Sequence, residues 1–147
     1  MAESARPPTV VAVLGYGGLL PFAATAVAAW LPVGWAPVAA FLFMGYSAAI
    51  LAFLGGLQWG IALQPGATRP AERLTVGVLP ALLAAVAVPL GVRSGAGLLL
   101  AGFLLLLAWD LPRNRATMPA WYGPMRLRLT AGVALCHVVF LAKFAVS

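Results

Sequence analysis

Six polar residues interrupt the apolar runs of this sequence and have side chains able to bond to one another or to a ligand. They are Gln58, Arg73, Asp110, Arg126, Thr130 and His137. The last three are spaced by four and seven residues, so a helix would carry them on one face. If the segments around the other three end on the same side of a bundle, the six would form one polar cluster.

Asp110 is the member of this set whose environment matters most. A carboxylate that is buried alone in a membrane is costly, whereas a paired one costs little. We therefore predict an ion pair between Asp110 and Arg126, with Arg128 or Arg73 as alternative partners. Such a pair would either fix two helices or bind a substrate or lipid headgroup, and the sequence leaves both interpretations open.

His137 is the only histidine in the chain, so we predict no metal site. It fits either a neutral, hydrogen-bonded packing residue or a step in a proton or ligand path. We expect Gln58 to hold helices together by hydrogen bonds. The sequence contains no Ser/His/Asp set, paired buried carboxylates or phosphate loop. It therefore favours a protein without catalytic activity, and it indicates no cofactor.

Composition shows which elements must position these residues. Hydrophobic residues make up 63% of the 147 residues and charged residues 8%, with a mean hydropathy of +1.01. Soluble proteins have roughly 25% charged residues, so lipid must be the solvent for most of this chain. The net charge is +6. The basic residues are not gathered in one patch with interleaved aromatics, so we expect no nucleic-acid partner.

The apolar runs predict an all-α transmembrane bundle in a single domain. A span needs about 20 apolar residues, and five such segments fit, at 9–31, 37–63, 71–90, 96–111 and 124–146. The fourth is short, about 24 Å long at about 1.5 Å per residue. The run 10–31 is longer than the roughly 7–15 residues of a signal-peptide core, so we expect it to be an uncleaved first span.

Charge asymmetry predicts the orientation. Seven of the nine basic residues fall on the side of the N-terminus and the second and fourth loops. They are Arg6, Arg69, Arg73, Arg113, Arg115, Arg126 and Arg128. Arg93 and Lys143 are on the other side. By the positive-inside rule, the N-terminus lies inside and the C-terminus outside the cell inner membrane.

The second span carries a regular row of small residues, which we call the small-residue face: Gly45, Ala49, Ala52, Gly56 and Gly60. Such a face lets a neighbouring backbone approach closely. We interpret it as packing within one subunit, with a dimer interface as the alternative. Pro21 and Pro80 are predicted kinks, because each removes a backbone donor from the middle of a span.

Several stretches resemble a known family. They are LGYGGLLPF at 14–22, YSA at 46–48, ILAFLGG at 50–56, WG at 59–60, and WY at 121–122 followed by Arg126. Together they are similar to a domain-of-unknown-function family of small bacterial inner-membrane proteins that includes eukaryotic transmembrane protein 69. The resemblance implies an inner or mitochondrial membrane and a frequent histidine at the position of Gln58. It implies no established activity, substrate or cofactor.

Three functions remain open at this stage. The first is a non-catalytic accessory or assembly component that packs with partner membrane proteins or with itself. The second is a small transporter or channel that uses the polar cluster. The third is a lipid- or quinone-binding protein or enzyme. An exposed glycine face would favour the first, a water-filled cavity at Gln58 or His137 the second, and an apolar groove beside Asp110 and Arg126 the third.

Overall fold

The computed structural model describes residues 6–32 and 34–145, and within them all regular structure is helical. The helices are α1 (Thr9–Gly17), α2 (Leu19–Ala28), α3 (Trp35–Ala62), α4 (Pro70–Ala87), the 3-10 turn η1 (Val88–Leu90), α5 (Val92–Asn114) and α6 (Tyr122–Ala145). Five helical stretches are long and apolar enough to cross a membrane, with α1 joined to α2 and α4 joined to η1. The all-α class and the presence of five helices long and apolar enough to span a membrane are confirmed.

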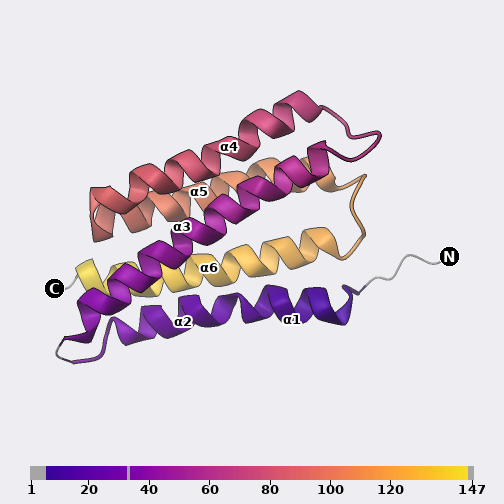
Figure 1. Cartoon of the computed structure of the whole chain (residues 1–147). Coiled ribbons are helices and arrows are strands. Elements are labelled where there is room, and N and C mark those ends of the chain that lie inside the picture. The colour runs from indigo at the N-terminus through magenta and orange to yellow at the C-terminus, as the bar shows by residue number, and fades with distance from the viewer. Residues whose placement is uncertain (1–5, 33, 146–147) are drawn as a thin grey trace.

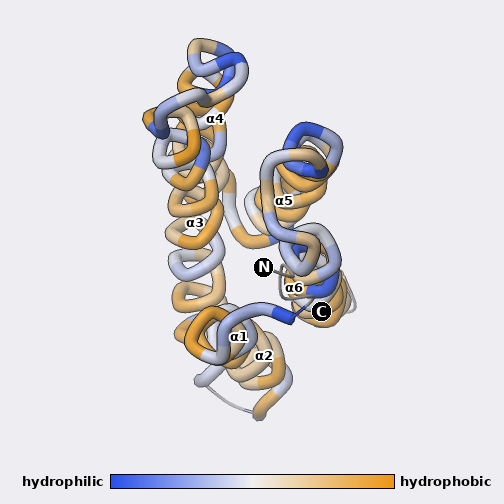
Figure 2. Tube along the Cα trace, turned by 90° about the vertical axis from the view of Figure 1, so that its right-hand side faces the viewer, coloured by the Kyte–Doolittle hydropathy of each residue, from blue (hydrophilic) through white to orange (hydrophobic). Residues whose placement is uncertain are grey.

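Consecutive spans run in opposite directions through the bundle (Figure 1). The start of α1 lies at the same end as the α3–α4 and α5–α6 connections, and the end of α6 lies at the opposite end. Figure 2 looks onto the first of these ends, where the hydrophilic stretches gather in the connections while the helix bodies are mostly hydrophobic. The residues predicted to cluster therefore belong to segments that end on one side.

The fourth span is longer than predicted. α5 runs from Val92 to Asn114, 23 residues or about 35 Å, so the prediction of a short span at 96–111 is wrong. Gly91 alone makes the preceding turn with its φ of 85°, and the helix continues through Pro112. The first span ends at Ala28, earlier than predicted. Val33 of the predicted first turn and the predicted end at Val146 lie outside the described residues.

The two prolines have different local effects. The first span is interrupted between α1 and α2, next to the Gly17 carbonyl that Pro21 leaves without its helical donor. The Tyr46 hydroxyl donates to the Gly18 carbonyl at 2.9 Å and so ties this interruption to α3. By contrast, α4 is continuous through Pro80, whose ring is buried beside Gly55 of α3.

Close backbone contact between α3 and α4 depends on two glycines. A Cβ atom on Gly77 would lie 2.8 Å from the Gly55 carbonyl oxygen, and one on Gly55 would collide with the Gly77 carbonyl oxygen. Neither helix could carry a side chain at this crossing. The Trp59 indole nitrogen donates to the Leu74 carbonyl at 3.0 Å beside it. This crossing positions the end of α3 against the start of α4, where Gln58 and Arg73 meet.

The small-residue face does not pack within the chain. Gly45, Ala49, Gly56 and Gly60 are exposed, and Ala52 is half-buried. In the described part of the chain, no atom beyond the local helix lies within 4 Å of a Cβ built on any of the three glycines. The interpretation as packing within one subunit is therefore wrong. The glycine that packs is Gly55, about 100° around the helix from Gly56.

Candidate functional site

Asp110 lies at the centre of a buried hydrogen-bond network. Its Oδ1 accepts hydrogen bonds from Gln58 Nε2 and Asn114 Nδ2, both at 2.6 Å. Its Oδ2 accepts from the Tyr122 hydroxyl at 2.8 Å and from Arg126 Nε at 3.2 Å. The carboxylate is fully buried, and each of its oxygens has two donors, which is the capacity of an ionised carboxylate.

Arg73 bonds the side-chain oxygen atoms of the same two amides, those of Gln58 and Asn114. Its Nη1 donates to Gln58 Oε1 at 3.0 Å, and its Nη2 donates to Asn114 Oδ1 at 2.9 Å. Each amide therefore accepts from the guanidinium and donates to the Asp110 carboxylate, so the two charges fix how both amides are oriented. We call these six residues the Asp110 network: Gln58, Arg73, Asp110, Asn114, Tyr122 and Arg126.

Helical spacing explains how the network assembles. Asp110 and Asn114 are four residues apart on α5, and Tyr122 and Arg126 are four apart on α6, so each pair shares a face. Gln58 lies in the last turn but one of α3, and Arg73 lies in the first turn of α4. The network thus joins four helices at the end where the basic residues gather.

A second, more exposed layer lies outside the network. Arg113 makes an ion pair with Glu72, with Nη2 and Oε1 2.8 Å apart, and so joins α5 to α4 again. The Arg113 guanidinium lies 4.6 Å from the centre of the Trp109 ring, and that of Arg73 lies 5.7 Å from it. Cations over aromatic faces are attracted by the ring quadrupole, so Trp109 stabilises both arginines.

The electrostatics of the network favour a fixed structure. Two guanidinium groups and one carboxylate give it a formal charge of +1. Burying ions carries a large desolvation cost that only good hydrogen bonding offsets. Among the described residues, every side-chain nitrogen or oxygen atom that is shut off from solvent has a hydrogen-bond partner. The Asp110 carboxylate is consequently saturated by the chain itself.

His137 lies apart from this network, in the aromatic core. Its Nδ1 is 2.9 Å from the Val133 carbonyl oxygen, and its Nε2 is 3.2 Å from the Ser47 hydroxyl. A carbonyl can only accept, so Nδ1 carries the proton and Nε2 accepts from Ser47. The rings of Phe43 and Phe103 lie 4.8 and 5.7 Å from the imidazole. The arrangement suits a neutral histidine that packs.

Most of the chain is similar to a known protein family. Residues 7–142 match the family described as "Protein of unknown function (DUF3429)". This chain belongs to that family. It is 33% identical to transmembrane protein 69 of Xenopus tropicalis over 121 residues, which are 80% of this chain and 47% of that protein. The predicted family resemblance is confirmed.

A second relative covers a shorter stretch. Transmembrane protein 69 of Mus musculus is 36% identical over 63 residues, which are 43% of this chain and 24% of that protein. The chain thus spans less than half the length of these relatives. No solved structure matches it. Family membership and the five apolar helices together identify a multi-pass membrane protein of unknown function.

The structure brings together four of the six residues of the predicted cluster. Gln58, Arg73, Asp110 and Arg126 are in one network, and the predicted Asp110–Arg126 ion pair is confirmed at 3.2 Å. Arg128, an alternative partner, is exposed. His137 shares the buried face of α6 but lies 11 residues from Arg126, about 16 Å along the helix. Thr130 is buried between them.

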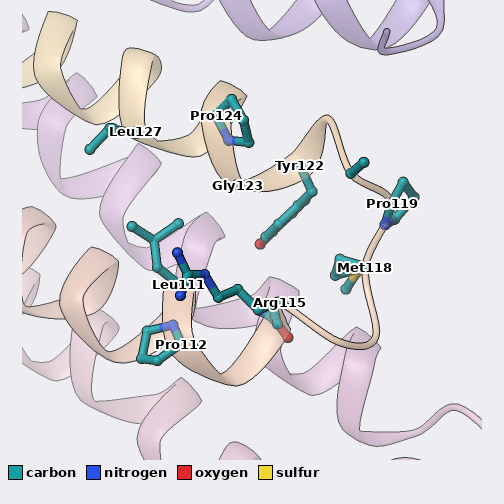
Figure 3. A pocket seen from close by; sticks show the side chains of 11 residues that line it. Leu111, Pro112, Arg115, Met118, Pro119, Tyr122, Gly123, Pro124 and Leu127 are labelled. Atoms are coloured by element: carbon teal, nitrogen blue, oxygen red, sulfur yellow. The ribbon is translucent and has the colours of Figure 1, made fainter. Parts of the chain in front are cut away.

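Sequence reasoning missed Asn114 and Tyr122. Both were assigned to the loop between the fourth and fifth spans, although each is four residues from a predicted member of the cluster. That spacing was the available signal. Both residues also line a surface cavity of about 580 Å³ formed by the α5–α6 connection. Its other walls include Leu111, Met118 and Leu127 (Figure 3), so this largely apolar cavity reaches the edge of the network.

Proposed function

We propose that this protein is a non-catalytic accessory or assembly component of the inner membrane that packs laterally against a helix of a partner membrane protein. The observation that carries the proposal is the small-residue face of α3. Four of its five members are exposed, and among the described residues no atom outside the local helix lies within 4 Å of a Cβ built on its glycines. In lipid, faces of this kind let two helix backbones approach closely.

The Asp110 network supports this proposal by holding α3 in place. A partner helix recognises a small-residue face by its shape, so the helix that carries it must keep its rotation and depth. Gln58 is bonded to Asp110 and, through its carbonyl oxygen, to Arg73. Two helices are therefore tied to α3 at the end where Gly56 and Gly60 lie.

The transport alternative has weaker support. Gln58 and His137 are fully buried, and their polar atoms are bonded to other side chains or to the backbone. A proton or solute path through either residue would have to break these bonds in each cycle. The same saturation gives catalysis no free group at the Asp110 carboxylate.

The proposed orientation places the N-terminus inside and the C-terminus outside. It rests on the basic residues, of which Arg93 and Lys143 belong to the end opposite the network. A reporter that is active only outside the inner membrane should work when fused after Ser147 and fail when inserted next to Arg115. The reverse pattern would overturn the orientation.

Cross-linking tests the lateral contact. A photo-reactive side chain at Ala49 should give a cross-link to one defined protein in native membranes, and Gly56→Leu should abolish it. The control is Ala85→Leu, which places the same side chain at an exposed position of α4 and should leave the cross-link intact. A cross-link to a second copy of this chain would make the protein a homodimer. Loss of the cross-link in the control, or its persistence in Gly56→Leu, would refute the proposed contact.

A further inference from the structure

An apolar cleft of about 170 Å³ lies between the first span, α3 and α6. Leu14 and Phe53 line it and are 71% and 69% exposed, so the cleft opens to the surface between α1 and α3. Phe22, Phe103 and Val133 form its inner wall. Because the helices cross the membrane, this opening faces lipid. An engineered apolar cavity of about 150 Å³ holds a benzene molecule, so the cleft has room for a segment of hydrocarbon.

Two polar side chains enter this apolar lining, and both have unused hydrogen-bond donors. Arg126 is 7% exposed and bonds only through Nε within the described chain, which leaves its two terminal nitrogens without a partner. Thr130 is 3% exposed, and its hydroxyl has no hydrogen bond to the described residues. Among the described residues, no side-chain nitrogen or oxygen atom that is shut off from solvent lacks a hydrogen-bond partner, so these unused donors must reach accessible space. Because both residues line the cleft, their donors are available there to a ligand that accepts hydrogen bonds.

The charge of the Asp110 network and the depth of Arg126 in the bundle indicate which chemical class of ligand would bind. The Asp110 network has one positive charge in excess, which an anion would neutralise. The free edge of a guanidinium group binds phosphate oxygens through two parallel hydrogen bonds. Arg126 is the fifth residue of α6, so it lies about one turn in from the basic end. From there the lining continues to Val133, about 10 Å deeper in the bundle.

The first span provides a way into the cleft. No residue of α1 is buried, and α1 is separated from α2 at the interruption that Tyr46 bonds. Gly15 and Gly18 belong to the lining together with Leu19 and Leu54. A chain moving laterally from the bilayer would meet this opening without having to pass through the bundle.

We propose that this cleft binds an anionic phospholipid. Its phosphate accepts hydrogen bonds from the terminal nitrogens of Arg126 and from the Thr130 hydroxyl, and part of one acyl chain fills the apolar cleft. The site shares no residue with the small-residue face, although Phe53 of its lining is one helical turn from Ala49 and Gly56.

The test uses the full chain, stripped of lipid in mild detergent, and native mass spectrometry to follow binding. Phosphatidylglycerol and phosphatidylcholine with identical acyl chains are titrated separately. Phosphatidylglycerol should bind about tenfold more tightly, because both lipids offer the phosphate but the choline ammonium of phosphatidylcholine cancels the negative charge beside the positive network. Inorganic phosphate should not displace it, because the acyl chain contributes to binding.

Three variants and their controls locate the site. Thr130→Val should weaken phosphatidylglycerol binding about threefold to tenfold, the value of one hydrogen bond. Its control is Thr75→Val at an exposed position of α4. Leu54→Phe should weaken binding by filling the cleft, whereas Leu105→Phe on the exposed side of α5 should not. Arg126→Lys keeps the charge but loses the fork, and Arg128→Gln is its exposed control.

Four results would each overturn the proposal. They are equal binding of the two lipids, wild-type binding in both Thr130→Val and Leu54→Phe, an equal loss in Arg128→Gln and Arg126→Lys, and displacement by inorganic phosphate. Binding of a quinone in place of phosphatidylglycerol would assign the cleft to an uncharged ligand and overturn it as well. If Arg126→Lys does not fold, the Thr130 and Leu54 variants still decide the question.

Discussion

Two faces of α3 lie one residue apart in the sequence but have opposite surroundings. A Cβ on Gly55 would collide with the backbone of α4, while a Cβ on Gly56 would meet nothing within 4 Å. Ser47, Leu51 and Gln58 share the face of Gly55 and are fully buried. The comparison shows that the spacing of small residues alone does not identify a packed face. A packed face is identified by the residues that point away from lipid, here Ser47, Leu51 and Gln58.

The buried face of α3 contacts all four other spans directly. Ser47 bonds His137 of α6 at 3.2 Å, and Gln58 bonds Asp110 of α5 at 2.6 Å. Gly55 meets α4 at the glycine crossing. Phe43 lies 5.8 Å from Phe22 of the first span, measured between ring centres, and Tyr46 bonds that span at its interruption. The exposed face makes no comparable contact with the described chain, so substitutions on the two faces should differ sharply in cost.

The largest loss of stability is expected for substitution of Asp110, whose carboxylate accepts a hydrogen bond from Gln58 on the buried face. Asp110→Asn leaves two buried guanidinium groups without a counter-charge, and losing one partner of a buried pair costs about 3–5 kcal/mol. Thermal and chemical unfolding in mild detergent would measure it. The double variant with Arg126→Gln should lose less than the two single variants added together. Additive losses would mean that the two residues do not act as a pair.

A leucine at the glycine crossing is expected to have the next largest effect. Gly55→Leu places a side chain against the backbone of α4, which cannot move aside as a flexible side chain would. Over-packing costs about 1–3 kcal/mol and sometimes more, and we expect the upper end of that range. The midpoint of thermal unfolding would report the loss, and an unchanged midpoint would place the α3–α4 crossing elsewhere.

At Gln58, two substitutions should separate hydrogen bonding from bulk. Gln58→Leu removes a donor from Asp110 and an acceptor from Arg73, and each lost hydrogen bond to a charged group costs about 1.5–3 kcal/mol. Gln58→His keeps one donor and one acceptor, so it should lose clearly less stability. If both variants unfold at the same temperature, Gln58 contributes through packing and not through the network.

A smaller loss is expected at Ser47. Ser47→Ala leaves His137 Nε2 as a buried acceptor without its donor, at a cost of about 1 kcal/mol. Adding His137→Phe removes the acceptor as well and suits the aromatic surroundings, so it should recover part of that loss. A further loss in the double variant would indicate that the imidazole contributes more than the hydrogen bond to Ser47.

The smallest effect is expected on the exposed face. Gly56→Leu should change the free energy of unfolding of the purified chain by less than about 0.5 kcal/mol, as surface substitutions usually do. It uses the same pair of residue types as Gly55→Leu, so the two variants are matched controls. A large loss of stability in detergent would mean that the isolated chain already buries this face, by self-association or otherwise.

The sequence predicted the number of spans and the centre of the network. Spans follow from gaps between charges, because a charge inside the hydrocarbon is costly. The Asp110–Arg126 pair follows from the same cost. The inward face of α3 was not predicted, because lipid is as apolar as a membrane-protein core and leaves no amphipathic pattern. Ser47 and Gln58 are 11 residues or about three turns apart, and this polar pair marks the correct face.

The ends of helices were harder to predict. The predicted fourth span ends at Leu111, yet α5 continues through Pro112 to Asn114. There Asn114 bonds both Asp110 and Arg73 and so holds the last turn of the helix in place. Tertiary hydrogen bonds of this kind join residues 41 or 52 positions apart. Local propensity contains no information on them, which is why Asn114 and Tyr122 were assigned to a loop.

The Asp110 network also implies an order in which the chain is completed during synthesis. Gln58, Arg73 and Asp110 emerge from the ribosome first, but Tyr122 and Arg126, which supply two of the four donors to the carboxylate, emerge only with the last helix. Until then the Asp110 carboxylate needs water in place of those donors. We expect a nascent chain that stops before Tyr122 to keep this end of the bundle hydrated. Insertion of α6 would then dehydrate it as the final event of folding.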